Sequence, residues 1–347
     1  MRAALLPRRV FAAATAAALG CAWFAPGPSR ARDPQRVQIA AGGLHSLSCL
    51  PLVLAEQLGY FAAEGVDVDL VDHASSARAL QAVLAGVADV VCGPYEQTLQ
   101  MHGRGRAHEA VALLSRTPAI SVGVSARTLS DYRTPADLRG RKIGVSAPGS
   151  PGDLVAHRLL ARAGVPAEDV AVVSVGTMAS ALAALRAGQV DAISHGEPLM
   201  TLLEQRAEVQ LVGETRTLRG TRNLFGGLLP WNCLHAPAEF VQRHGLVVQG
   251  LVHAQVRALK WLRQAGPRDL IRTVPRAVIG ADGAVFLAAM QRLRESLSPD
   301  GVLPEDGART AVRVMSAFES GLGAQRIDWP RTYNNQFALR AKARFQA

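Results

Sequence analysis

Aromatic side chains and cysteines are scarce in this chain of 347 residues: Phe, Trp and Tyr together make up 5% of it, and there are 4 cysteines. The shortage of aromatic residues argues against the stacking platforms with which proteins bind single-stranded nucleic acids. The 38 Lys and Arg residues are scattered along the chain rather than clustered, so we predict no nucleic-acid partner. Hydrophobic residues make up 49%, and low-complexity tracts are absent. The sequence therefore predicts a compact globule with room for two domains.

Motifs of the common catalytic and metal sites are also missing. The sequence contains no Gly-x-Ser-x-Gly, phosphate loop, dinucleotide fingerprint, His-Glu-x-x-His or Cys-x-x-Cys. We therefore predict no catalytic residues, no cofactor and no metal, and a protein that is not an enzyme. Three cysteines follow the N-terminal region, namely Cys49, Cys92 and Cys233. Burial as small apolar side chains is the favoured interpretation, and a disulfide between two of them stays open.

Hydrophobic runs long enough to span a membrane are absent from the body of the chain, whereas the N-terminus has the pattern of an export signal. Arg8 and Arg9 precede an apolar stretch that ends at Phe24, and small residues follow. We predict a signal peptide over residues 1–31 and a periplasmic protein. The arginine pair is similar to a twin-arginine signal and Cys21 to a lipid-anchor site, and both alternatives stay open. Removal of the signal lowers the formal net charge from +10 to +6.

The sequence repeats itself at an offset of 102 residues. Residues 79–91 and 181–193 share Ala, Leu, Ala, Ala, Gly and Asp at the same places. In each copy a helix ends at the glycine, and the aspartate leads into a β-branched strand. A strand, a loop, a helix and a second strand precede each copy, over residues 37–71 and 142–175. The fold class predicted is α/β, with two lobes that each contain a mostly parallel sheet flanked by helices.

The two lobes are predicted to be joined by two crossings. A strand at 119–124 carries the chain into the second lobe, and residues 225–231 bring it back. The helices expected near the C-terminus have no counterpart in the repeat, and we expect them to pack on the first lobe. Ligands of open α/β sheets bind beyond the carboxyl ends of the strands, which places the ligand in a cleft between the lobes. The division predicted is 36–124 with 227–347 for the first lobe and 125–226 for the second.

Candidate ligand-binding residues of the first lobe follow its first strand. Ser46, Leu47 and Ser48 lie just before a helix predicted over residues 51–60. Hydroxyl and backbone N–H groups at the start of a helix attract a ligand oxygen, because the helix dipole is positive there. Ser48 suits a plain N-cap equally well.

The second lobe offers the matching candidates Ser146, Ser150 and Gly152. Glycine at this place lets the backbone approach a ligand closely. Asp153 follows these residues, and it is an alternative helix cap that would oppose an anion.

Three further candidates follow other strands. Tyr95 and Glu197 occupy equivalent positions of the repeat. Tyr95 offers a ring for stacking and a hydroxyl for hydrogen bonding, and Glu197 either binds an ammonium group or braces the second lobe, with bracing favoured. Trp231 lies beside the return crossing, where it either walls the cleft or belongs to the core.

Several segments resemble the periplasmic substrate-binding proteins of ABC transporters, in the branch similar to nitrate-, sulfonate-, taurine- and thiamine-precursor-binding proteins. The resemblance spans about residues 36–340. It implies a two-lobed fold of type II that closes on a small-molecule ligand and passes it to a membrane permease, as a monomer. The segments that carry it are residues 51–66, which include Gly59-Tyr60-Phe61, residues 85–89, residues 137–145, which begin Asp-Leu-Arg-Gly, and Glu197-Pro198.

The ligand predicted is a small organic anion, such as a sulfonate or a carboxylate. The two serine-bearing helix starts and the net charge of +6 favour an anion. The alternative is a thiamine-precursor-type pyrimidine or another nitrogenous compound, which Tyr95, Trp231 and Glu197 would suit. A biosynthetic enzyme on the same fold and an extracytoplasmic sensor are the other functions that stay open.

Overall fold

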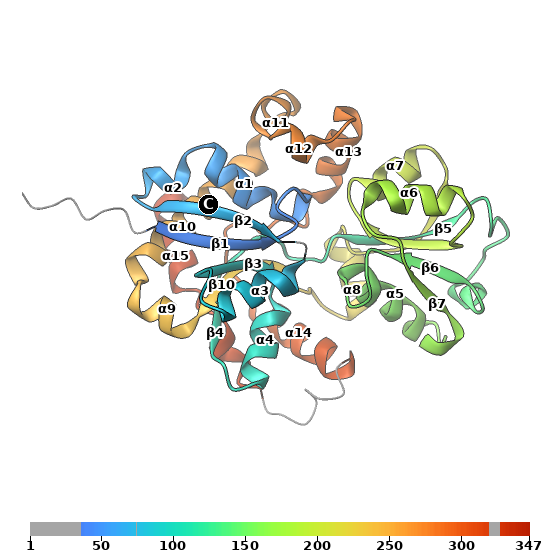
Figure 1. Cartoon of the computed structure of the whole chain (residues 1–347), viewed down its shortest axis with the longest axis horizontal. Helices are drawn as coiled ribbons and strands as arrows, with labels where there is room; N and C mark the ends of the chain where they lie inside the picture. The colour runs from blue at the N-terminus through green and yellow to red at the C-terminus, as the bar shows by residue number, and fades with distance from the viewer. Residues whose placement is uncertain (1–35, 74, 319–326) are drawn as a thin grey trace, which may run out of the picture. The chain divides into compact units, whose positions relative to one another are not determined.

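A computed structural model of the chain describes residues 36–73, 75–318 and 327–347, so the export signal predicted over residues 1–31 lies outside the described residues. Residues 34–347 form one compact unit, in which the chain builds two sheets (Figure 1). In the described part of the chain, no helix combines the length and the apolar character needed to cross a membrane.

The first sheet contains five strands in the order β2-β1-β3-β10-β4. β1, β2 and β3 are parallel, whereas β10 runs antiparallel between β3 and β4. The second sheet has the order β7-β6-β8-β5-β9, with β5 as its antiparallel strand. One strand in each sheet thus runs against its neighbours, which confirms two mostly parallel sheets. The bounds are β1 (Arg36–Gly42), β2 (Asp67–His73), β3 (Val90–Pro94), β4 (His108–Leu113), β5 (Ile120–Ser125), β6 (Lys142–Val145), β7 (Ala171–Ser174), β8 (Ala192–Gly196), β9 (Val209–Glu214) and β10 (Asn232–Pro237).

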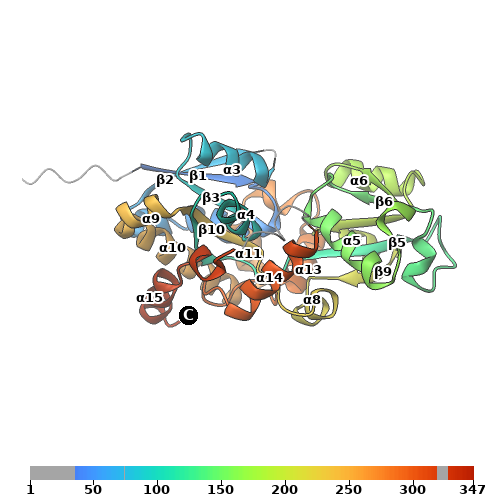
Figure 2. The same cartoon turned by 90° about the horizontal axis from the view of Figure 1, so that it is seen from below.

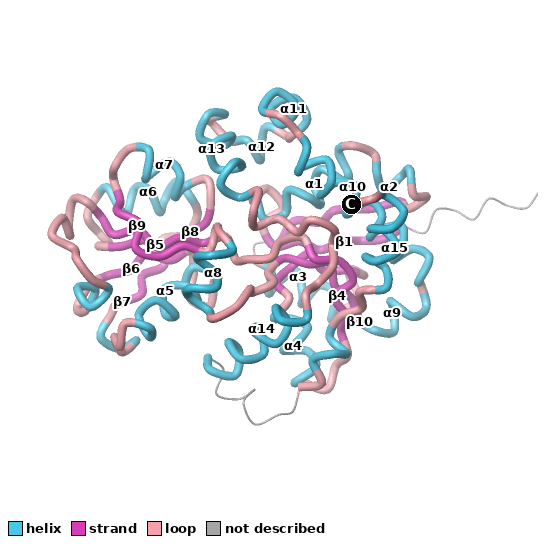
Figure 3. The backbone as a smooth tube through the Cα atoms, turned by 180° about the vertical axis from the view of Figure 1, so that it is seen from behind, coloured by secondary structure: helices cyan, strands magenta, loops and turns pink. Residues whose placement is uncertain are grey.

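Helices cover both faces of each sheet (Figures 2 and 3). With the first sheet lie α1 (Leu50–Gln57), α2 (Tyr60–Ala63), α3 (Ser76–Leu84), α4 (Glu96–Gly103), α9 (Ala238–Arg243), α10 (Gly245–Gln264) and α15 (Gln336–Phe345). With the second lie α5 (Pro151–Arg162), α6 (Met178–Arg186), α7 (Leu199–Gln205) and α8 (Leu218–Phe225). The remaining helices are α11 (Pro267–Thr273), α12 (Arg276–Ile279), α13 (Gly283–Leu293) and α14 (Glu305–Phe318).

The C-terminal helices α10, α13 and α15 pack on the first lobe as expected, since their buried residues share one hydrophobic core with its sheet. α10 and α15 pack on each other, and α10 also contacts α1 and β4 of the first lobe. α13 buries Phe286, Ala289 and Met290 in that core and also contacts α7 of the second lobe. An ion pair between Arg292 of α13 and Glu204 of α7 joins these two helices, so α13 links the two lobes.

The aspartate of the sequence repeat has the same structural task in both lobes. Asp89 accepts a hydrogen bond from the backbone N–H of Gln38 at 2.9 Å, and Asp191 accepts one from Lys142 at 3.0 Å. Each carboxylate therefore satisfies a backbone N–H near the start of the neighbouring strand, β1 or β6. The glycines that end the preceding helices, Gly86 and Gly188, have φ values of +73° and +71°. Glycine recurs because the left-handed conformation favours it, and aspartate recurs because its carboxylate accepts a hydrogen bond from the neighbouring strand.

The first segment that connects the two lobes ends before β5 begins. β5 pairs with β8 on one side and β9 on the other, so it belongs to the second sheet, although the predicted division gave residues up to 124 to the first lobe. The two crossings lie side by side: the backbone N–H of Trp231 donates to the carbonyl of Ser115 at 2.9 Å, and that of Asn232 to its hydroxyl at 3.0 Å. The two segments that connect the lobes are thus hydrogen-bonded to each other.

Two histidines are buried together in the first sheet. The rings of His108 and His235 have centroids 5.7 Å apart, and Nε2 of His235 lies 3.1 Å from Oε1 of Gln97. Burial lowers the pKa of His235 well below its usual value and that of His108 to about 4. Both imidazoles are therefore neutral in the folded protein at neutral pH.

Acid is expected to destabilise the fold through this pair. An unfolded histidine takes up its proton near pH 6.5, whereas folded His108 does so only near pH 4, so the stabilisation is complete above pH 6.5 and is lost as the pH falls towards 4. For His108 the loss approaches about 3 kcal/mol. Urea unfolding at pH 7 and pH 4.5 measures it, and His108→Gln should show a smaller loss. An equal loss in both proteins would contradict this account.

Candidate functional site

A cavity of about 280 Å³ lies between elements of the two lobes. The start of α5, which follows β6, forms one side, and α4, which follows β3, forms another. Both helices therefore begin at the carboxyl ends of parallel strands, the place where open α/β sheets bind ligands. The residues around the cavity are Glu96, Gln100, Gly149, Ser150, Asp153, Leu154, His157, Trp231, Val314 and Met315.

The start of α5 carries its own carboxylate. Ser150 is the N-cap, and its hydroxyl accepts a hydrogen bond from the backbone N–H of Asp153 at 3.3 Å. The Asp153 carboxylate accepts one from the backbone N–H of Gly149 at 2.7 Å, and its other oxygen lies 3.2 Å from Nδ1 of His157. Asp153 thus occupies the positive end of the helix and reaches the cavity with Ser150.

The first lobe contributes a polar helix face and a tryptophan. Glu96 and Gln100 are one turn apart on α4, so both side chains lie on the face towards the cavity. Trp231 lines the cavity, yet only 5% of its surface is exposed. It is therefore both a wall of the cleft and a core residue. Among the described lining residues, Glu96, Asp153 and His157 carry the titratable groups, and lysine and arginine are absent.

The candidates after β1 lie elsewhere. The hydroxyls of Ser46 and Ser48 are 2.8 Å apart, and the carbonyl of Ser48 accepts a hydrogen bond from the side chain of Asn232 at 3.0 Å. Leu47 is buried in the core. None of these three lines the cavity. Helix α1 begins at Leu50 with Cys49 as its N-cap, so the alternative interpretation of Ser48 as a plain N-cap of this helix is wrong.

Tyr95 belongs to the core rather than to a ligand cleft. Its side chain is fully buried, its hydroxyl lies 2.6 Å from that of Thr332, and its ring meets Tyr333 edge-on. Burial raises the pKa of the Tyr95 hydroxyl above its usual value. The prediction that Tyr95 contacts a ligand is corrected accordingly, because packing and a hydrogen bond within the protein occupy both parts of the side chain.

Glu197 braces the second lobe, as the favoured interpretation held. One carboxylate oxygen lies 2.9 Å from the guanidinium of Arg216, and the other accepts a hydrogen bond from the backbone N–H of Thr201 at 3.0 Å. Glu204 and Glu214 contact the same guanidinium, each at 2.7 Å. Arg216 carries no signal in the sequence that would mark it, since it lies beyond the repeat and in none of the motifs.

Ser146 and Gly152 serve the second lobe itself. The carbonyl of Ser146 accepts hydrogen bonds from Ser174 and Gly176, both at 3.2 Å. A Cβ atom on Gly152 would lie 2.3 Å from the carbonyl oxygen of Ser194, whose hydroxyl donates to the Gly152 carbonyl at 2.7 Å. The close approach that needs a glycine is therefore between α5 and β8, and not between the backbone and a ligand as predicted.

Gly152→Ala is expected to lower the free energy of unfolding by about 1–3 kcal/mol, because backbone atoms on both sides must move apart. Gly245→Ala is the matched control, since a Cβ there meets nothing within 4 Å. Thermal or urea unfolding compares the two. A control variant destabilised as much as Gly152→Ala would refute the steric explanation.

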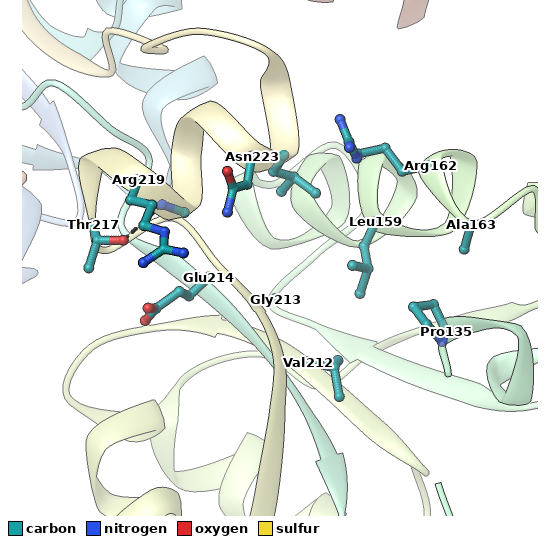
Figure 4. Close-up of a pocket in the computed structure, with 12 residues that line it drawn as sticks. Pro135, Leu159, Arg162, Ala163, Val212, Gly213, Glu214, Thr217, Arg219 and Asn223 are labelled. Carbon is teal, nitrogen blue, oxygen red and sulfur yellow. Dashed lines mark hydrogen bonds between the residues drawn. The ribbon is translucent and has the colours of Figure 1, made fainter. Parts of the chain in front are cut away.

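A second cavity, of about 810 Å³, belongs to the second lobe alone (Figure 4). It lies between α5, α8 and β9, with Arg219 and Asn223 of α8 on one side and Leu159 and Arg162 of α5 on the other. A movement of one lobe against the other would not enclose a ligand there. The cavity beside Ser150 and Trp231 is therefore the better candidate for a site that closes.

Comparisons with known proteins point to one family. The family model described as NMT1/THI5 like matches residues 47–265, which is more than half of the chain. A solved structure from Bordetella bronchiseptica RB50 is 43% identical, with a TM-score of 0.83, over 91% of this chain and 99% of that one. The alkanesulfonate-binding protein SsuA from Xanthomonas axonopodis pv. citri, bound to MOPS, is 21% identical, with a TM-score of 0.68, over 88% of this chain and 100% of that one. YtlA of Bacillus subtilis (strain 168), whose name describes a binding protein, is 20% identical over 85% of this chain and 86% of its own length.

Proposed function

The chain belongs to the NMT1/THI5-like family, and from this premise we propose that it captures a small molecule between its two lobes and delivers it to the permease of an ABC transporter. The observation that carries the proposal is the cavity beside Trp231, because residues of both lobes wall it. A ligand held there contacts α4 and α5 together, so binding favours the arrangement in which the two helices approach each other.

The crossings supply the hinge for this movement. We propose that residues 120–226 move as one lobe against the rest of the described chain. Hydrogen bonds of Ser115 with Trp231 and Asn232 hold the two crossings together, so rotation is confined to a few residues. Trp231 belongs to the hinge and also lines the cavity. A ligand in the cavity would therefore contact the hinge directly.

Two ligand classes remain in competition, and each has its own support. The likeness to a sulfonate-binding protein supports a small organic anion, which would be held by the serine at the start of α5. The carboxylates of Glu96 and Asp153 support a nitrogenous compound, since an ammonium or amidine group would pair with them and a planar ring would pack on Trp231. On the charges around the cavity alone, the nitrogenous class fits better.

We further propose that the protein acts in the periplasm, as a monomer, and without chemical change of its ligand. Both lobes belong to the same chain, so one copy of the protein is sufficient to enclose a ligand. The described lining residues offer carboxylates, an imidazole and a hydroxyl, and Asp153 and His157 contact each other across one helical turn. This arrangement suits recognition by hydrogen bonds and charge.

A ligand panel tests the function. Thermal unfolding of the full chain is measured with nitrate, sulfonates, aromatic carboxylates, polyamines and thiamine precursors. A ligand at 100 times its dissociation constant adds about 2.7 kcal/mol to the free energy of unfolding, which raises the midpoint clearly. A shift with one class identifies the ligand class, and mass spectrometry should recover that compound unchanged. Conversion of the compound would show an enzyme, and the absence of any shift would contradict the proposed ligand classes.

A further inference from the structure

Two of the described cysteines lie side by side in the first lobe. The sulfur atoms of Cys49 and Cys92 are 4.0 Å apart, and both side chains are buried. Cys49 is the N-cap of α1, and Cys92 lies on β3, opposite Ala41 of β1. A disulfide requires the sulfurs to approach to about 2.05 Å. The two sulfurs must therefore move about 2 Å closer together for the bond to form.

The sheet excludes Cys233 from this pair. Side chains alternate between the faces of a sheet along a strand, so Cys92 and Gly93 point to opposite faces. Cys233 lies opposite Gly93 in the antiparallel register, and its side chain therefore points away from Cys92. The hydrophobic cores agree, because Cys49 and Cys92 share one and Cys233 belongs to another. Of the three possible pairs, the structure leaves Cys49 with Cys92.

We propose that Cys49 and Cys92 are a redox site, which closes to a disulfide when the chain meets a disulfide-containing oxidant. The Cys49 thiolate attacks one sulfur of the oxidant, which forms a mixed disulfide and releases one thiolate. Cys92 then loses its proton and attacks the sulfur of Cys49, which releases the second thiolate. Two protein thiols become one disulfide, and the disulfide of the oxidant becomes two thiols.

Cys49 is the thiol placed to attack, because it is the N-cap of α1, where the positive end of the helix favours a thiolate. Hydrogen bonds with Cys92 and with the hydroxyls of Ser46 and Ser48 lower the pKa of the Cys49 thiol. The pKa of Cys92 is raised by its hydrogen bond with Cys49 and by burial. A thiolate is the reactive form, so the lower pKa favours attack by Cys49. The exposed side chain of Ser46 shows that the segment next to Cys49 borders solvent, which is the side from which an oxidant would approach.

The disulfide would fasten the start of α1 to β3. The amide of Asn232 donates to the carbonyl of Ser48, so the fastened segment also contacts the residue that follows the return crossing. Oxidation would therefore stiffen the first lobe next to the hinge. The redox site does not depend on the proposed ligand site, and either can fail without the other.

Peptide mapping tests the redox site on the full chain carrying Cys21→Ser, which removes the N-terminal thiol. The protein is treated with oxidised glutathione, and the remaining thiols are alkylated in denaturant. We expect a linked peptide that joins Cys49 to Cys92, a mass loss of about 2 Da and an alkylated Cys233. Alkylated Cys49 and Cys92, or a link from either to Cys233, would overturn the proposal.

Serine variants test the order of the two steps. In Cys92→Ser, glutathione should stay attached to Cys49, whereas in Cys49→Ser it should not attach to Cys92. Cys233→Ser is the matched control, because it removes a buried thiol of the same lobe and should form the disulfide as before. Glutathione on Cys92 and none on Cys49 would contradict the assignment of the attacking thiol. The mapping of the unsubstituted pair remains decisive if a serine variant fails to fold.

Discussion

Replacement of Arg216 by methionine is expected to lower the free energy of unfolding by about 3–5 kcal/mol. The Arg216 side chain is 4% exposed and contacts the carboxylates of Glu197, Glu204 and Glu214. Its removal leaves Glu197, whose side chain is 1% exposed, as a buried charge without its cationic partner. Burial alone would lower the pKa of Arg216, but hydrogen bonds with Glu204 and Glu197 outweigh it and raise the pKa. Arg216 is therefore charged throughout the accessible pH range.

The matched control is Arg243→Met. Arg243 also forms an ion pair, with Glu239 one turn earlier in α9, but its side chain is 71% exposed. Such surface pairs contribute little, so we expect a change within about 0.5 kcal/mol. Urea unfolding at pH 7 gives both free energies. Similar losses in the two variants would show that burial of the carboxylates does not decide the stability of this cluster.

The same cluster also joins the second lobe to the C-terminal helices. Arg292 of α13 contacts Glu204, which is a partner of Arg216. Leu218, at the start of α8, donates its backbone N–H to the carboxylate of Glu295 at 3.0 Å. Loss of Arg216 is thus expected to loosen the contact between α7 and α13 as well as the second lobe itself.

The sheets could be predicted from the sequence because their signals are local and occur twice. The glycine and aspartate of the repeat act within a few residues of their own helix and strand, so their spacing is visible in the sequence. Asp89 and Asp191 show this directly, since each accepts a hydrogen bond from the backbone of a strand in its own lobe, β1 or β6. The antiparallel place of β5 was not visible, because it depends on pairing with β8 and β9, which follow much later in the chain.

The cavity was harder to predict because distant segments build it. Ser150 and Trp231 were identified from their positions after a strand and beside a crossing. Val314 and Met315 come from α14, whose apolar residues resemble those of any amphipathic helix. Tyr95 has the position of a ligand contact, yet its partner Thr332 lies 237 residues later and draws it into the core. Long-range partners of this kind leave no pattern in a single sequence.

Gln100→Trp is expected to abolish ligand binding. Gln100 faces the cavity of about 280 Å³ from α4, and an indole there would occupy the space between α4 and the start of α5. The variant retains every N-cap and every charge around the cavity. The expected loss of affinity is at least about 1,000-fold, or about 4 kcal/mol.

Asn223→Trp is the matched control, because Asn223 lines the cavity that belongs to the second lobe alone (Figure 4). Titration calorimetry of the full chain and both variants, with the panel compound that raises the unfolding midpoint most, tests the location of the ligand. The account predicts that Gln100→Trp no longer binds and that Asn223→Trp binds as the unsubstituted protein does. Unchanged binding by Gln100→Trp, together with lost binding by Asn223→Trp, would contradict the claim that the ligand is held between the two lobes.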